Sequence, residues 1–279
     1  MGLAPIAALF KDAIAGEVRA VFKDGSRRRA DVKPGTGLFA SHSVVRRVHA
    51  DVTTMMVGGV AALLLQMLHP AVLAGVWDHS DFRHDMLGRL RRTASFISVT
   101  TYGDRRQAES AIGRVRLIHE KIEGALADGT PYAANDPKLL AWVHVCEATS
   151  FIDAWMRYAN PFLSRTDQDA YFADMAQIAE ALGADPVPRS RAEAMRLIGR
   201  MRAELACDRR TREVARLVLS QRAETLGASS FQAIATQAAI DLLPVWARRM
   251  HGLAGSRVTR PLVHAGTFGL ARTIRWALN

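Results

Sequence analysis

One histidine stands where an apolar helical stripe would place an imidazole inside the protein. The stripe consists of Ile112, Val115, His119, Ile122 and Leu126. Intervals of three and four residues put such side chains on one face of a helix. A buried imidazole needs a hydrogen bond or a metal ion, because an unpaired polar group in an apolar interior is costly. His119 is therefore a candidate metal ligand.

A candidate partner for a cofactor precedes this histidine by one helical turn. Arg116 lies three residues before His119 and would lean towards a neighbouring face. An apolar pocket with one imidazole and one arginine suits a haem, since the imidazole can ligate iron and the guanidinium can pair with a propionate. The same spacing fits a core histidine that is hydrogen-bonded within the protein. Spacing alone leaves both explanations open.

A second group of polar residues could bind an anion or a small oxygen species. Arg89, Arg92 and Thr93 are separated by three and four residues, which places them on one face of a helix. Two cationic donors and a hydroxyl could hold a carboxylate, or an oxygen species on a metal. An exposed basic helix face has the same pattern, and it stays an alternative.

Other reactive residue types form no established motif. His69, Asp78 and His79 lack the spacing of a zinc site, and the sequence contains no HExxH, Walker A or GxSxG motif. Cys146 and Cys207 form no CxxC pair, which favours a reducing compartment. The apolar first ten residues have no basic segment before them, so we expect no signal peptide and a cytoplasmic location.

The composition is that of a soluble helical protein. Hydrophobic residues make up 49% and charged residues 23% of the 279 residues, which excludes a disordered, collagen-like or multi-span membrane chain. The abundance of Ala, Leu and Arg favours helices over strands. The net charge is +10, and 32 of the 37 basic residues are Arg. Nucleic acid or an anionic membrane could attract such a charge, but no nucleic-acid-binding motif accompanies it.

Capping residues predict an all-α fold of about ten helices. Asn135-Asp136-Pro137 starts a helix, Ser164 starts another that ends near Gly183, and Ser190 with Glu193 forms a capping box. The uncharged stretch 52–77 is long enough to span a membrane, but its Pro70 favours a buried helix followed by a turn. We expect residues 1–45 to be a lead-in and residues 46–279 to form a single domain.

A series of motifs in order resembles a known family. The motifs are Gly58-Gly59, Leu64-Leu65-Gln66, His69-Pro70, His79-Ser80, Gly88-Arg89 to Arg92-Thr93, Tyr102-Gly103, Arg116 to His119, Pro131-Tyr132, Ala134-Asn135-Asp136-Pro137 and Ala141-Trp142-Val143-His144. They resemble the domain shared by bacterial rubber oxygenase (latex clearing protein) and the fungal mpaB-type oxygenase. The likeness covers about residues 50–190 and weakens towards the C-terminus.

The resemblance implies a globin-like helical core that binds haem b. It implies that His119 is the proximal iron ligand and that Arg116 matches the arginine three residues before it. The family's distal pattern R-x-x-K-T is matched by Arg89, Arg92 and Thr93, with Arg in the Lys position. Because Arg almost never coordinates iron, we expect a sixth position that is open or occupied by water.

One departure from the family limits the prediction of substrate. Rubber oxygenase uses a glutamate near the distal pocket, whereas this chain has no Glu between Asp51 and Ala108. Asp78, Asp81, His69 or His79 could replace it. The sequence therefore does not predict cleavage of rubber or secretion.

The sequence predicts a cytoplasmic, haem-b-dependent oxygenase-like protein. His119 would hold the iron, with Arg116 and Arg89 as further cofactor-binding residues, and Arg92 and Thr93 would donate hydrogen bonds to dioxygen. The substrate would be small and lipophilic, such as an alkene or isoprenoid. Two alternatives stay open: a haem carrier or sensor without turnover, and a basic helical module for nucleic acid or anionic membrane. Residues 241–279 could make a peripheral membrane contact.

Overall fold

The computed structural model describes residues 36–221, 226–253, 265–269 and 272–273. Its elements are α2 (Val44–His49), α3 (Val52–Gln66), α4 (Pro70–His79), α5 (Met86–Tyr102), α6 (Arg105–His119), β1 (Glu123–Ala125), β2 (Pro131–Ala133), α7 (Pro137–Tyr158), α8 (Arg165–Leu182), α9 (Arg191–Met201), a 3-10 turn (Arg202–Glu204), α10 (Arg209–Leu219), α11 (Leu226–Leu242) and α12 (Val245–His251). Helices dominate, so the predicted all-α single domain is confirmed.

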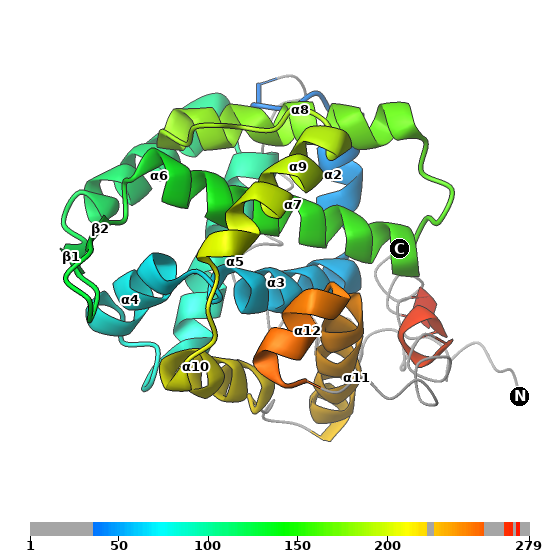
Figure 1. The fold of residues 1–279 in the computed structure, drawn as a ribbon. Helices are drawn as coiled ribbons and strands as arrows, with labels where there is room; N and C mark the ends of the chain where they lie inside the picture. Colours follow the sequence, from blue (N-terminus) through cyan, green and yellow to red (C-terminus); the bar gives the residue numbers. More distant parts are fainter. Residues whose placement is uncertain (1–35, 222–225, 254–264, 270–271, 274–279) are drawn as a thin grey trace, which may run out of the picture.

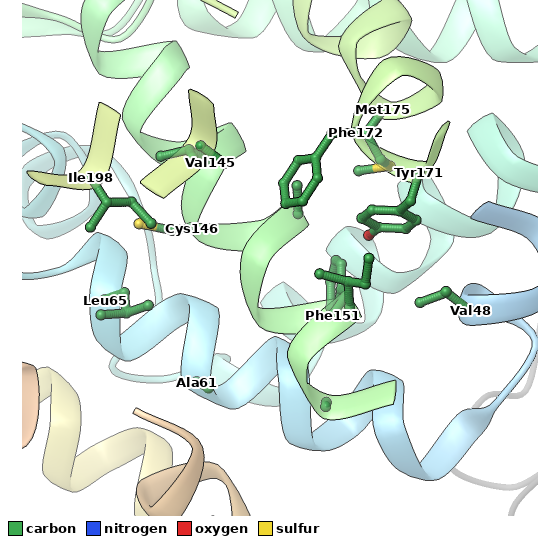
Figure 2. Close-up of a cluster of buried hydrophobic side chains, with 14 of the residues drawn as sticks. Val48, Ala61, Leu65, Val145, Cys146, Phe151, Tyr171, Phe172, Met175 and Ile198 are labelled. Carbon is green, nitrogen blue, oxygen red and sulfur yellow. The ribbon is translucent and has the colours of Figure 1, made fainter. Parts of the chain in front are cut away.

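Two long helices form the centre of the molecule. Figure 1 shows α3 and α7 through the middle, with α8 and α9 on one side and α10 to α12 on the other. Because neighbouring helices cover α7 on most sides, apolar residues line most of its circumference. In Figure 2, Cys146 and Phe151 of α7 lie between Leu65 of α3 and Tyr171 of α8. Burial of these side chains is the main force that holds the helices together.

The uncharged stretch breaks where proline predicts a break. Helix α3 ends at Gln66, and α4 begins with Pro70 at its first position, at an angle of 104° to α3. In the part of the chain described by the structure, no single helix is long and apolar enough to cross a membrane. The bent α3–α4 pair passes that test only when both helices are counted together. Most of α3 is buried in the protein, as a core helix should be.

The predicted caps are confirmed at three helix ends. The Asp136 carboxylate accepts hydrogen bonds from the first turn of α7, and the Ser164 hydroxyl caps α8. Gly183 ends α8 with φ 97°, a conformation that favours glycine. The predicted capping box at α9 is only half formed. Ser190 caps the helix, but Glu193 accepts from the backbone N–H of Arg189 rather than that of Ser190.

The prediction that Ile112, Val115, His119, Ile122 and Leu126 share one helix face is wrong for the residues after His119. Helix α6 ends at His119, so Ile122 and Leu126 lie outside the helix. The chain instead enters the β1–β2 hairpin, in which Gly124 faces Tyr132. Gly129 closes the hairpin with φ 85°. Its Asp-Gly turn is a strong hairpin signal that outweighs the apolar spacing.

The predicted lead-in over 1–45 falls mostly outside the described residues. Within residues 36–45, Phe39, Val44 and Val45 are buried in the core. The boundary at residue 45 stays a prediction. About half of residues 241–279, for which a peripheral membrane contact is predicted, also falls outside the described chain.

Candidate functional site

The predicted site residues lie on a helical hairpin made of α5 and α6. The Asp85 carboxylate caps α5, and Asp104 forms a reciprocal capping box with Gln107 at the start of α6. Gly103 joins the two helices. A Cβ atom there would lie 2.5 Å from the Val99 carbonyl oxygen, so the tight turn requires glycine. The hairpin packs against α2 and α8.

The side chains of α6 that face the interior become more exposed to solvent towards His119 at the end of the helix. Ala108 and Ile112 are buried, whereas Val115 and His119 are only half-buried. The interior-facing side chains of α5 become more exposed towards the start of that helix. Thr100 is buried, Phe96 is half-buried, and Thr93 is exposed. Since the helices are antiparallel, both sets of side chains become more exposed at the same, open end of the hairpin.

This open end brings Arg89 close to His119. Burial lowers the pKa of His119, and the nearby Arg89 charge lowers it further. The imidazole makes no hydrogen bond within the part of the chain described here. A neutral, half-buried ring without a partner has a free lone pair, which is what an iron ligand needs.

Arg89 is the second residue of this pair. Its guanidinium donates a hydrogen bond from Nη1 to Ser80 Oγ at 3.0 Å. Burial, and then the charge of Arg92, lowers the pKa of Arg89. A guanidinium nevertheless stays protonated in proteins. Most of its donors make no contact with a carboxylate in the described chain, so Arg89 could accept a carboxylate from a cofactor.

The other three predicted residues lie further from the interior. Arg92 Nη1 lies 3.0 Å from Asp85 Oδ2, and both side chains are exposed. The Thr93 hydroxyl donates to the Arg89 carbonyl oxygen within α5 at 3.2 Å. Arg116 is exposed and forms no ion pair with the described residues. The hairpin thus brings Arg89 and His119 together, while Arg92 and Thr93 have partners of their own.

Helix α7 carries two interior polar groups, His144 and Glu147, to which the sequence analysis assigned no chemical role. His144 is buried, and its Nε2 atom has no hydrogen-bond partner in the described chain. Burial lowers the pKa of His144 to about 4. Glu147 is half-buried one turn later, and burial raises its pKa to about 7 although the nearby Gln66 amide lowers it. A carboxyl group that titrates near neutral pH can exchange protons in an interior site.

A buried network links α2, α5 and α8. His49 Nδ1 lies 2.8 Å from Thr101 Oγ1, and His49 Nε2 lies 3.2 Å from the Tyr171 hydroxyl. Both ring nitrogens therefore have protein partners, so His49 is a structural histidine. His119 differs from His49 in exactly this respect.

The residues around α4 form no metal site. Tyr132 donates to Asp78 Oδ2 at 3.0 Å, and His79 Nε2 lies 3.1 Å from the Glu123 carbonyl oxygen. No group of three or more His, Cys, Asp or Glu in the described chain could hold a metal ion. A haem needs only one protein ligand for its iron, so the donor set fits a haem and does not fit a protein-ligated ion.

A separate cavity of about 920 Å³ lies between the hairpin β1–β2 and the starts of α4 and α7. His69, Tyr132, Lys138 and Glu204 are among its lining residues. None of the five predicted site residues lines it. The cavity is thus distinct from the open end of the α5–α6 hairpin.

The comparisons with known proteins agree with this helical oxygenase-like architecture. A sequence model of the family described as "ER-bound oxygenase mpaB/B'/Rubber oxygenase, catalytic domain" matches residues 46–276. The match covers most of the chain, so the protein belongs to this family of oxygenases. The resemblance predicted from the ordered motifs is confirmed.

Two mycobacterial relatives share part of the sequence. The chain is 26% identical over 126 residues to "Uncharacterized protein Mb2261" of Mycobacterium bovis and to "Uncharacterized protein Rv2237" of Mycobacterium tuberculosis. The match covers 44% of this chain and 49% of each relative, so the chain spans about half the length of these curated relatives. No solved structure gives a significant match.

Proposed function

We propose that the protein is a haem-b-dependent oxygenase that acts on a small lipophilic substrate, such as an alkene or isoprenoid. Membership of the oxygenase family supports the reaction class. The observation that carries the cofactor assignment is His119 at the open end of α5 and α6, a half-buried imidazole without a hydrogen-bond partner among the described residues. A bound haem would supply the binding and activation of dioxygen.

Each residue near the open end has a distinct task in this proposal. His119 would ligate iron, and burial together with the positive charge of Arg89 lowers the pKa of the imidazole, which favours the neutral form that a ligand needs. Arg89 would pair with one propionate, and the exposed Arg116 would pair with the other. Arg92 and Thr93 would donate hydrogen bonds to dioxygen in the pocket. To do so, Arg92 must leave Asp85, which costs little because exposed ion pairs contribute about 0–1 kcal/mol.

A carrier or sensor without turnover is the second candidate function. Its specific support is the engagement of both donors, since Arg92 pairs with Asp85 and Thr93 bonds to its own helix. In that case haem would bind in the same place, but dioxygen would find no free donor. The proposal of a basic module for nucleic acid has no motif in its favour.

Oxygen consumption distinguishes the two candidates. We expect the haem-supplied protein to consume dioxygen when squalene is added as an isoprenoid alkene. Arg92→Gln and Thr93→Val should each lower the rate at least tenfold, because removal of a donor to a developing charge typically costs about 10²–10³ in rate. Arg200→Gln, an exposed arginine on α9, is the matched control. Normal haem binding without oxygen consumption would favour the carrier or sensor.

A further inference from the structure

Exposed aliphatic side chains gather at the open end of the α5–α6 hairpin. Leu117 is 62% exposed, Ile118 is 52% exposed and Leu87 is 39% exposed. They are three of the six large hydrophobic residues that are exposed in the described chain. Leu87 lies in the first turn of α5, while Leu117 and Ile118 lie in the last turn of α6. These two turns lie at the same end of the hairpin, where Arg89 of α5 is close to His119 of α6.

Helix geometry directs these side chains away from the proposed haem site. Residues of an α-helix are about 100° apart around the axis, so Leu117 lies about 160° from His119. Ile118 lies about 100° from His119 by the same geometry. Leu117 therefore faces solvent when His119 faces the interior. A cofactor on His119 cannot cover Leu117, so the aliphatic exposure needs another explanation.

Cations without partners surround the aliphatic residues. Arg91, Arg114 and Lys121 are exposed and form no ion pair within the described chain. Arg91 follows Leu87 by one turn, and Arg114 precedes Leu117 by one turn. Glu120 and Glu123 are the exposed acidic residues that flank Lys121 after the end of α6. The local balance is positive, in contrast to the neutral Arg105–Glu109 pair at the start of α6.

We propose that this region docks on an anionic lipid bilayer, with the outer, solvent-facing surface of α5 and α6 against the membrane. The docking surface comprises Leu87, Arg91, Arg114, Leu117, Ile118 and Lys121. Aliphatic side chains flanked by arginine and lysine match the acyl and phosphate layers of an anionic interface. The entry of a lipophilic substrate from that bilayer rests on the proposed function, whereas the docking itself does not.

Other occupants fit this surface less well. A second copy of the chain would bring the same positive charges face to face, and like charges oppose association. Nucleic acid would neutralise the cations, but it would leave Leu117 and Ile118 exposed to water. Only an anionic interface with an apolar layer beneath it satisfies both kinds of side chain.

Vesicle sedimentation tests the docking surface with the full-length, haem-supplied protein. The probes are vesicles of phosphatidylcholine alone and vesicles with 30% phosphatidylserine. We expect binding only to the anionic vesicles. Each cation near an anionic surface contributes about 1 kcal/mol, or about 5-fold in partitioning, so Arg91→Gln with Arg114→Gln should weaken binding by about 30-fold. Leu117→Ser with Ile118→Ser should weaken binding as well.

A charge-matched control separates this surface from the rest of the basic chain. Arg196 and Arg200 are exposed on α9 and form no ion pair within the described chain. Their double substitution by Gln should change binding less than 2-fold. An equal loss in this control, an unchanged affinity in the Arg91→Gln/Arg114→Gln variant, or self-association through Leu117 without vesicles would overturn the proposal.

The test also separates docking from the proposed function. Haem binding is read from the absorption spectrum of the same samples. Vesicle binding without a haem spectrum would support the docking surface and contradict the haem assignment. A haem spectrum without vesicle binding would support the haem assignment and contradict the docking surface.

Discussion

The contact between α3 and α7 predicts opposite effects at two adjacent glycines. A Cβ atom on Gly58 would lie 2.9 Å from the Ser150 carbonyl oxygen and 3.0 Å from the Phe151 Cα atom. Both are backbone atoms of α7, which cannot move aside as a flexible side chain can. A Cβ atom on Gly59 would meet only the Phe151 ring, at an ordinary 3.8 Å. Gly59→Ala is therefore the matched control for Gly58→Ala.

The expected magnitudes follow from packing and helix propensity. Overpacking in a core costs about 1–3 kcal/mol, and alanine in a helix gains up to about 1 kcal/mol over glycine. Gly58→Ala should therefore lower the free energy of unfolding by about 1–2 kcal/mol. Gly59→Ala should raise it by about 0.5–1 kcal/mol. At about 2–4 °C per kcal/mol, the melting temperature should fall by about 2–8 °C for Gly58→Ala and rise by about 1–4 °C for Gly59→Ala.

Thermal and urea denaturation of both variants measure these effects. The two probes should agree, because the contact lies at the centre of one domain. If Gly58→Ala were as stable as Gly59→Ala, α3 and α7 could not approach as closely as described, and the position of every helix that packs on them would be in doubt.

Three further predictions concern titration and capping. The pKa of Glu147, raised to about 7, means that its contribution to stability is present below about pH 4.5 and is lost as the pH rises through 7. Glu147→Gln should be about 2 kcal/mol more stable than the wild type at pH 8 and equal at pH 4.5 in urea denaturation. The pKa of His144, lowered to about 4, means that stability falls as the pH drops from 6.5 to 4. His144→Leu should flatten that slope, and a slope like that of the wild type would contradict the burial of a neutral ring. Asp136→Ala removes the cap of α7 and should cost about 1 kcal/mol by the same measurement, with the exposed Glu120→Ala unchanged within about 0.5 kcal/mol.

Local chemistry made some features predictable from the sequence. The start of α7 at Asp136, the end of α8 at Gly183 and the break at Pro70 depend on caps and backbone geometry that act over a few residues. The ordered motifs were specific enough to indicate the family, which the match over residues 46–276 confirms.

Features that depend on long-range contacts escaped the sequence analysis. Glu147 interacts with Gln66, 81 residues earlier in the chain, and no periodic pattern marks it because α7 is buried on most sides. Ile122 and Leu126 continue the helical spacing of apolar residues by coincidence, so the sequence predicted a helix beyond His119. The Asp128-Gly129 pair was the signal for the hairpin turn that the structure has there. The spacing of Arg92 did not predict its ion pair with Asp85, which lies seven residues earlier and binds the guanidinium.

The central claim is that His119 holds a haem. The most direct test is the absorption spectrum of the haem-supplied protein, compared between wild type, His119→Ala and His144→Leu. We predict a Soret band in the wild type and in His144→Leu, and its loss or a clear shift in His119→Ala. No band in any of the three proteins, or a band that is retained in His119→Ala and lost in His144→Leu, would contradict the assignment.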